Sequence, residues 1–232
     1  MVLAPILITL FIALLPAVVW LFFFLKEDAH PEPRALLLKA FIFGALASIP
    51  AYLMQYGLKE ITGTYSFSEY SLLVVLLLAV TEETVKWGAA RHAVRKNPAF
   101  DEPVDAMMYV LVAGLGFATV ENLFIAGSVM QSLGASGIAS AGETLLLRLI
   151  GATLLHTLAS ALVGYYWARG IAAGRENRYV VLGILIASAV HALFNLLVYA
   201  FQTINLLYPT LFLIAVSFSV LRNFETLKKG RP

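Results

Sequence analysis

Long apolar stretches recur along the whole chain, and they restrict its fold more than any other feature. Segments of roughly 18–24 residues lie at about 3–25, 36–57, 71–92, 104–127, 144–168, 179–201 and 204–221. The hydrocarbon core of a bilayer is crossed by about 20 apolar residues in an α-helix. No pattern typical of β-strands competes with this interpretation. The sequence therefore predicts an all-α, polytopic transmembrane helix bundle with about seven spans.

The composition supports a membrane protein and excludes several other classes. Of the 232 residues, 60% are hydrophobic and only 13% are charged, which leaves too little polar surface for a soluble domain of this length. There is no cysteine, so disulfides, a cysteine nucleophile and thiolate metal ligands are excluded. Links between the apolar segments are short, and no internal repeat is present. We therefore predict that residues 1–232 form a single integral membrane domain.

The basic residues alternate between the two ends of the predicted bundle. They cluster after the first, third and fifth apolar segments and in the tail, whereas the alternate links hold few. Under the positive-inside rule this predicts a multi-pass membrane protein with an external N-terminus and a cytoplasmic C-terminus. The basic residues follow the topology, so we expect the lipid bilayer and no nucleic acid as a partner. The Gly- and Ser-rich stretch at 127–143 is expected to be the longest outer loop.

Ionisable and amide side chains lie deep inside four consecutive apolar segments. A charged group near the bilayer centre costs roughly 2.5–3.5 kcal/mol on insertion scales, so such residues need partners or a function. At about 1.5 Å of rise per residue, these groups fall at similar depths in their helices. We therefore predict one shared site within a catalytic core at about 71–200. Its candidate members are Glu82, Glu83 and Lys86, then Glu121 and Asn122, then His156, and finally His191 and Asn195.

Spacing within two of these segments predicts which side chains share a helix face. Glu82 and Lys86 are four residues apart and can form an ion pair, while Glu83 points about 100° away. The Lys86 ammonium would then keep Glu82 ionised in a site of low dielectric constant. His191 and Asn195 are also four residues apart, so we expect them to act on the same molecule.

Other residues near these segments have structural explanations. Arg148 and Glu143 fall at the outer interface, where long side chains can reach back to water. Gly114 and Gly116 allow a neighbouring helix to approach closely. Asp105, near the start of the fourth segment, is expected to cap that helix or anchor it at the interface.

The side chains that are present narrow the possible chemistry. The H-E-x-x-H motif of zinc proteases and a G-x-S-x-G frame are absent, and no aspartate lies mid-segment for an aspartyl dyad. What remains is carboxylate with imidazole. A glutamate can take a proton from water, and a second carboxylate or an imidazole can hold that water. A histidine and an asparagine can donate hydrogen bonds to the oxyanion of a tetrahedral intermediate.

Two other interpretations use the same residues without hydrolysis. The deep polar pairs could serve only to hold helices together in a membrane scaffold or binding module. Buried Glu and His could instead relay protons or cations in a transporter. Transporters often carry paired broken helices or repeats, and neither is visible in this sequence. A scaffold can lose its base, whereas this chain retains the whole set, which favours an enzyme.

Four short motifs follow one another along the deep segments, each on its own predicted helix. They are EETVK at 82–86, GFATVEN at 116–122, the histidine of LLHTLASALVGYYW at 154–167, and HALFN at 191–195. In this order they resemble the PrsW family of intramembrane proteases, within the type II CAAX prenyl endopeptidase superfamily. The resemblance covers about residues 71–196. It implies a hydrolase that cuts a single-span membrane protein, such as the first cut of an anti-sigma factor outside the membrane.

The resemblance also implies roles for individual residues. Glu82 would be the general base, and His191 with Asn195 would hold the oxyanion. Glu121 stands where prenyl endopeptidases have a histidine, so the second partner of the catalytic water is either Glu121 or His156. The same superfamily resembles a scaffold subunit of gamma-secretase, so a non-catalytic scaffold is the alternative.

The carboxylates and imidazoles also raise the question of a metal. Glu82, Glu121, His156 and His191 offer the oxygen and nitrogen ligands that Zn²⁺ accepts. We favour metal-free glutamic chemistry over a metalloprotease. In that case Glu83 completes the catalytic set, with Lys86 and Asn122 in support.

Overall fold

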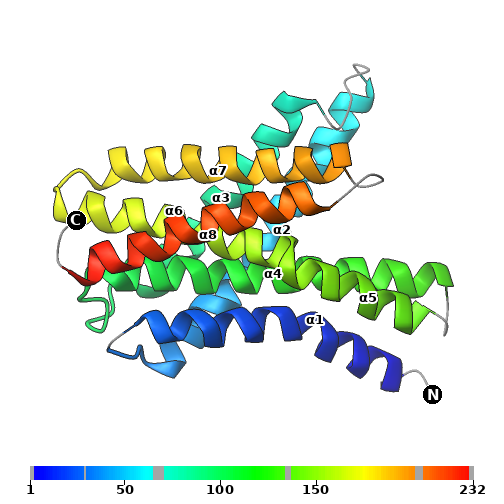
Figure 1. Ribbon diagram of the computed structural model, residues 1–232, viewed down its shortest axis with the longest axis horizontal. Coiled ribbons are helices and arrows are strands. Elements are labelled where there is room, and N and C mark those ends of the chain that lie inside the picture. Colours follow the sequence, from blue (N-terminus) through cyan, green and yellow to red (C-terminus); the bar gives the residue numbers. More distant parts are fainter. Residues whose placement is uncertain (1–2, 29, 65–70, 134–136, 202–205, 230–232) are drawn as a thin grey trace.

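The structure is a computed structural model that describes residues 3–28, 30–64, 71–133, 137–201 and 206–229. Within these ranges every regular element is a helix, so the all-α prediction is confirmed. Most helices run along one direction, and α2 and α3 are inclined to the others (Figure 1). The elements are α1 (Leu3–Phe24), η1 (Leu25–Glu27), α2 (Arg34–Thr64), α3 (Leu72–Val94), α4 (Pro103–Leu133), α5 (Gly137–Ile150), α6 (Ala152–Ala172), α7 (Glu176–Phe201) and α8 (Leu207–Lys228).

The predicted number of spans can be compared with the helices themselves. Six segments of the described chain are long and apolar enough to cross a membrane: α1, α2, α4, the α5–α6 pair, α7 and α8. α3 is not among them, because Glu82, Glu83 and Lys86 interrupt its apolar sequence. Its 23 residues are long enough for a span. The seven predicted spans thus correspond to six apolar segments and one helix whose charges need partners inside the bundle.

The predicted outer loop at 127–143 is wrong for most of its length. α4 continues through the first part and α5 fills the rest, apart from residues 134–136, which lie outside the described part. The apolar segment predicted at 144–168 is also two helices rather than one. α5 and α6 meet at Gly151, whose backbone leaves the helical region (φ −95°, ψ −101°).

Tertiary packing explains why this stretch is helical. Its small residues are typical of a loop, but Ala141 and Leu145 lie four residues apart on one face of α5. Both are buried in a small cluster with Ala13 of α1 and Ala126 of α4. Packing of an apolar face stabilises a helix more than local propensity does.

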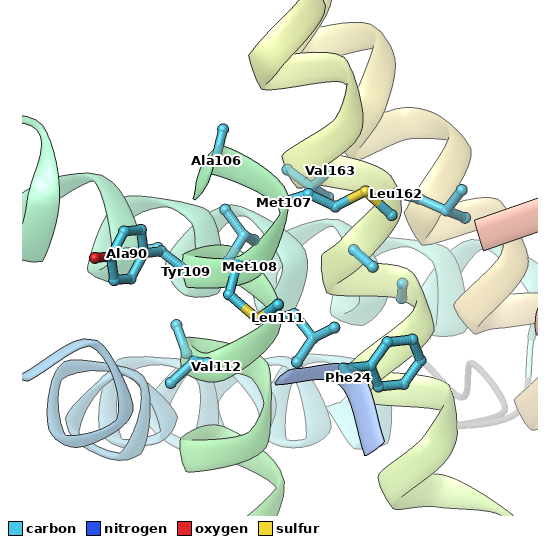
Figure 2. Close-up of a cluster of buried hydrophobic side chains, with 14 of the residues drawn as sticks. Phe24, Ala90, Ala106, Met107, Met108, Tyr109, Leu111, Val112, Leu162 and Val163 are labelled. Carbon is cyan, nitrogen blue, oxygen red and sulfur yellow. The ribbon is translucent and has the colours of Figure 1, made fainter. Parts of the chain in front are cut away.

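α4 is the centre of the bundle and packs against α1, α2 and α6. Figure 2 shows part of the buried cluster around it. The labelled side chains include Phe24 of α1, Met107, Met108 and Leu111 of α4, and Leu162 and Val163 of α6. Close-packed side chains of this kind fix the position of α4 relative to α6, and the two helices carry two of the deep polar motifs.

Glycines bring the backbones of three helices into contact at this centre. A Cβ atom added at Gly116 of α4 would overlap the Phe41 carbonyl oxygen of α2. A Cβ at Gly114 would overlap the Ser160 side chain of α6. The close approach predicted for these two glycines is therefore confirmed, with α4 close to α2 at Gly116 and close to α6 at Gly114.

The two termini lie at opposite ends of the bundle (Figure 1). The end that holds the C-terminus also holds the connections from α1 to α2, from α3 to α4 and from α6 to α7. At this end Arg91 and Arg95 of α3 lie 3.4 and 3.2 Å from the Glu176 carboxylate of α7. The predicted alternation of basic links is thus reproduced, and we call this the basic end. Which side of the membrane it faces stays a prediction.

Buried carboxyl groups gather at the basic end, where the chain ahead of α2 lies against α4. Glu32 accepts a hydrogen bond from the Tyr109 hydroxyl and lies beside Asp105. Asp105 accepts hydrogen bonds from the two backbone N–H groups of Asp101 and Glu102, which caps α4 as predicted. Burial, and then the neighbouring Asp105 carboxyl, raises the pKa of Glu32 to about 8, although the Tyr109 hydrogen bond opposes this.

This raised pKa predicts how the stability of the bundle depends on pH. The unfolded chain releases the Glu32 proton near pH 4.5, whereas the folded chain releases it near pH 8. The contribution of Glu32 to the free energy of unfolding is therefore fully present below pH 4.5 and is lost as the pH rises to about 8. Thermal unfolding in a single detergent, followed across this range, should show the fall. Glu32→Gln should flatten it, and Glu143→Gln, at an exposed position, should not. An unchanged pH slope in Glu32→Gln would contradict the prediction.

Candidate active site

Of the three charged residues of α3, one faces a cavity and two are buried in the protein interior. The Glu82 side chain is 16% exposed and faces the cavity, whereas Glu83 and Lys86 are fully buried. The predicted ion pair of Lys86 with Glu82 is present, but the closer partner of Lys86 is Glu83. Lys86 Nζ donates to Glu83 Oε1 at 2.7 Å and lies 3.9 Å from Glu82 Oε2, beyond hydrogen-bond distance. The ammonium is drawn inward because it also contacts His156 and lies 4.8 Å from the centre of the Phe117 ring.

The ion pair on α3 orients His191 of α7. Glu83 Oε1 lies 2.8 Å from His191 Nδ1, so the same carboxylate oxygen contacts both Lys86 and His191. A carboxylate can only accept, so Nδ1 carries the proton and the lone pair of Nε2 is free. That nitrogen lies 3.7 Å from Glu82 Oε2. Glu83 thus orients His191 through a hydrogen bond and does not itself line the cavity.

His156 of α6 is held at both ring nitrogens. Nδ1 lies 2.8 Å from Lys86 Nζ, and because an ammonium can only donate, Nδ1 accepts. Nε2 therefore carries the proton and donates to Glu121 Oε2 of α4, also at 2.8 Å. Its ring meets the His191 ring edge to face, with centroids 5.1 Å apart. In this state His156 has no free lone pair with which to take a proton from water.

Glu121 is also bound by Arg148, which the sequence predicts at the outer interface. Arg148 Nη2 of α5 donates to Glu121 Oε2 at 3.0 Å, and its Nε donates to Asn122 Oδ1 at 2.6 Å. Asn122 is buried and donates to Thr153 of α6 at 3.2 Å. The expectation that Arg148 reaches back to water is therefore wrong. The sequence contains a signal for Arg148 as a site residue. This arginine lies inside the apolar stretch LLLRLI, and a charge at membrane depth indicates a functional site.

These contacts form one continuous series of hydrogen bonds across five helices. Each link is 2.7–3.0 Å long. In order, the series joins Arg148, Glu121, His156, Lys86, Glu83 and His191. Glu82 stands outside it, and its Oε2 atom has no hydrogen-bond partner among the described residues. Glu83 Oε2 has none there either, but it is buried away from the cavity.

The cavity has a volume of about 850 Å³ and is open on one side. Its polar lining brings together Glu82, Glu121, Arg148, His156, His191 and Asn195. The remaining walls are mainly apolar side chains from α2, α3, α4, α6 and α7. The four helices predicted to share a site thus converge, and they deliver Glu82, Glu121, His156, His191 and Asn195 to one space. Glu83, Lys86 and Asn122 do not line the cavity.

Three of the side chains in the cavity offer the kinds of atom that bind a metal ion. Glu82, His156 and His191 each offer one ligand atom, and these atoms lie within 4.8 Å of one another. A catalytic zinc is generally held by three protein ligands. Both nitrogens of His156 are already hydrogen-bonded, and the Lys86 ammonium lies 3.9 Å from Glu82. Glu82 and His191 are thus the free donors of this set, one fewer than the three protein ligands that generally hold a catalytic zinc.

Comparison with known proteins agrees with the motifs. Residues 32–221 match a sequence profile described as "PrsW family intramembrane metalloprotease". The "Protease PrsW" of Geobacillus kaustophilus is 30% identical over 208 residues, which cover 89% of this chain and 86% of that protein. That of Clostridioides difficile is 26% identical over 188 residues, 79% of this chain and 76% of that protein. That of Bacillus subtilis is 28% identical over 183 residues, 77% of each.

No solved structure matches the chain. The bacterial relatives and the membrane-competent helices make it a multi-pass integral membrane protein. The profile covers most of the chain and includes all four motifs, each of which places at least one side chain in the lining of one cavity. This chain belongs to the PrsW family of intramembrane proteases.

Proposed function

We propose that this protein is an intramembrane endopeptidase in which Glu82 activates the attacking water. One observation carries the proposal. Of the carboxylate and imidazole groups that line the cavity, Glu121 and His156 are already hydrogen-bonded to charged or polar neighbours, whereas Glu82 Oε2 has no partner among the described residues. His191 Nε2 faces it at 3.7 Å. Two atoms at that separation can share one water, since each hydrogen bond is about 2.8 Å long.

The proposed reaction uses Glu82 as base and then as acid. Glu82 takes a proton from the water, whose oxygen attacks the carbonyl carbon of the scissile peptide bond. The lone pair of His191 Nε2 orients that water, and Glu83 keeps the lone pair in place. When the tetrahedral intermediate collapses, the C–N bond breaks and Glu82 returns its proton to the leaving nitrogen. One water is consumed, and a carboxyl and an amino terminus are produced.

The oxyanion needs hydrogen-bond donors in the same cavity. Asn195 lies one turn after His191 on α7, and its side-chain amide can donate in any protonation state. His191 can donate at Nε2 only once it is protonated, because the neutral form held by Glu83 accepts there. We therefore assign the oxyanion to Asn195 first and to His191 in its protonated form. The resemblance implies that His191 and Asn195 hold the oxyanion together, and the proposal places Asn195 first.

The proposed substrate is a single-span membrane protein, with an anti-sigma factor as the cellular example. The resemblance of the motifs supports this class. The mainly apolar walls of the cavity also suit a substrate segment that arrives from the membrane rather than from water. Because Glu82 and His191 are the free donors of the set, the proposed mechanism uses no metal ion.

Cleavage by the purified protein in liposomes tests the proposal. A single-span substrate should be cut at one peptide bond, mapped by mass spectrometry of both fragments, and a strong zinc chelator should leave the rate unchanged. Binding of the substrate without fragments would indicate a scaffold instead. A proton flux in the same liposomes, without cleavage, would indicate a transporter. A loss of cleavage on chelation that zinc restores would overturn the metal-free mechanism.

A further inference from the structure

α5 contributes a charged side chain to the cavity although it carries none of the four family-like motifs. Arg148 lies three residues before the break at Gly151, and its side chain is only 16% exposed. α5 is fixed there by Leu145, which is buried against α1 and α4. A guanidinium held at this depth needs a function or a partner, and it has two hydrogen-bonded partners on α4.

The two partners of Arg148 hold it in one position. Its Nε donates to Asn122 Oδ1 at 2.6 Å, and Asn122 is in turn bound to Thr153 of α6 and to the Ala13 carbonyl of α1. Its Nη2 donates to Glu121 Oε2 at 3.0 Å. The planar guanidinium therefore spans two neighbouring residues of α4 with fixed geometry, which a lysine ammonium cannot reproduce.

The atom that Arg148 binds is the one that also binds His156. Glu121 Oε2 accepts from Arg148 Nη2 and from His156 Nε2 at the same time. Glu121 is 31% exposed, so without the arginine its carboxylate would be held by His156 alone and could turn toward the proposed water. It would then compete with Glu82 for that water and release the ring of His156, which lies beside His191.

We propose that Arg148 is a positioning residue of the active site: it holds Glu121 against His156 and so leaves Glu82, among the described residues that line the cavity, as the one carboxylate free to bind the water. This inference rests on the proposed peptidase function. It assigns different tasks to two glutamates that both line the cavity. Arg148 itself need not touch the substrate.

A double-mutant cycle in the liposome assay tests this role. Arg148→Met should lower kcat by about 10²-fold, the effect of a slight misplacement of reacting groups, with KM within about twofold of the wild type. Arg148→Lys should recover part of that loss. If Arg148 acts through Glu121, Arg148→Met should lower kcat little further in a Glu121→Gln background. Leu147→Ala, at a 63% exposed neighbouring position, should retain the wild-type rate.

The outcomes separate this role from others. Equal losses of kcat from Arg148→Met with and without Glu121 would overturn the proposal, and so would a change confined to KM, which indicates a substrate contact. Should Arg148→Met fail to fold, Arg148→Ala with added guanidinium replaces it, and a rate restored by guanidinium but not by sodium supports the role. No restoration in folded Arg148→Ala contradicts it. The peptidase function is judged separately, by wild-type cleavage and its loss in Glu82→Gln.

Discussion

Glu82→Gln should lower kcat by about 10²–10⁴-fold, the range expected when a general base is removed. The amide has the shape of the carboxylate but cannot accept the proton of the water. Glu82 Oε2 has no hydrogen-bond partner among the described residues, so the substitution breaks no hydrogen bond of that atom, and the nearest charged or titratable groups lie 3.7–3.9 Å away. The thermal midpoint in detergent should therefore stay at or above that of the wild type.

Single-turnover cleavage of the single-span substrate is the measurement for Glu82→Gln. Glu143→Gln is the matched control, since it makes the same chemical change at an exposed position of α5. It should retain the wild-type rate. If Glu82→Gln also cleaved within about tenfold of the wild type, the base would have to be sought elsewhere, with His191 the next candidate.

Lys86→Met should produce the largest loss of stability among single substitutions at the site. Lys86 and Glu83 are both fully buried, and their ion pair is 2.7 Å long. Removal of one partner from such a pair generally costs about 3–5 kcal/mol, because the other charge is left buried without compensation. The change also frees His156 Nδ1, so activity should fall with stability.

The double variant Lys86→Met with Glu83→Gln separates charge from packing. Since it removes both charges, it should be more stable than Lys86→Met alone, although His191 loses its carboxylate and activity should remain low. Thermal unfolding in detergent, with circular dichroism to confirm helix content, measures both variants. A double variant less stable than either single variant would show that the pair is not held together by its opposite charges.

Much of the fold and site could be predicted because membrane insertion leaves few alternatives. Each long apolar segment has to be a helix, and the deep charges on α3, α4, α6 and α7 have to find one another. The convergence of Glu82, Glu121, His156 and His191 on one cavity follows from that requirement. The cost of a buried charge is therefore the strongest constraint that the sequence carries.

The details that could not be predicted depend on contacts between helices. A lysine at position 86 can reach back to either preceding glutamate, three or four residues away, and the spacing alone does not decide between them. The choice of Glu83 is made by His156 and His191, which come from other helices. Arg148 was misassigned for a similar reason, since the break at Gly151 changes the direction of its helix relative to α6.

The charges inside α3 also have a consequence for biogenesis. His156 follows Lys86 by 70 residues, and His191 follows Glu83 by 108 residues, so their partners leave the ribosome much later. Until then α3 holds two carboxylates and an ammonium that favour water over hydrocarbon at the translocon. The active site is thus completed only after α7 has been synthesised. A nascent chain that stops earlier leaves these charged groups of α3 without their partners from α6 and α7.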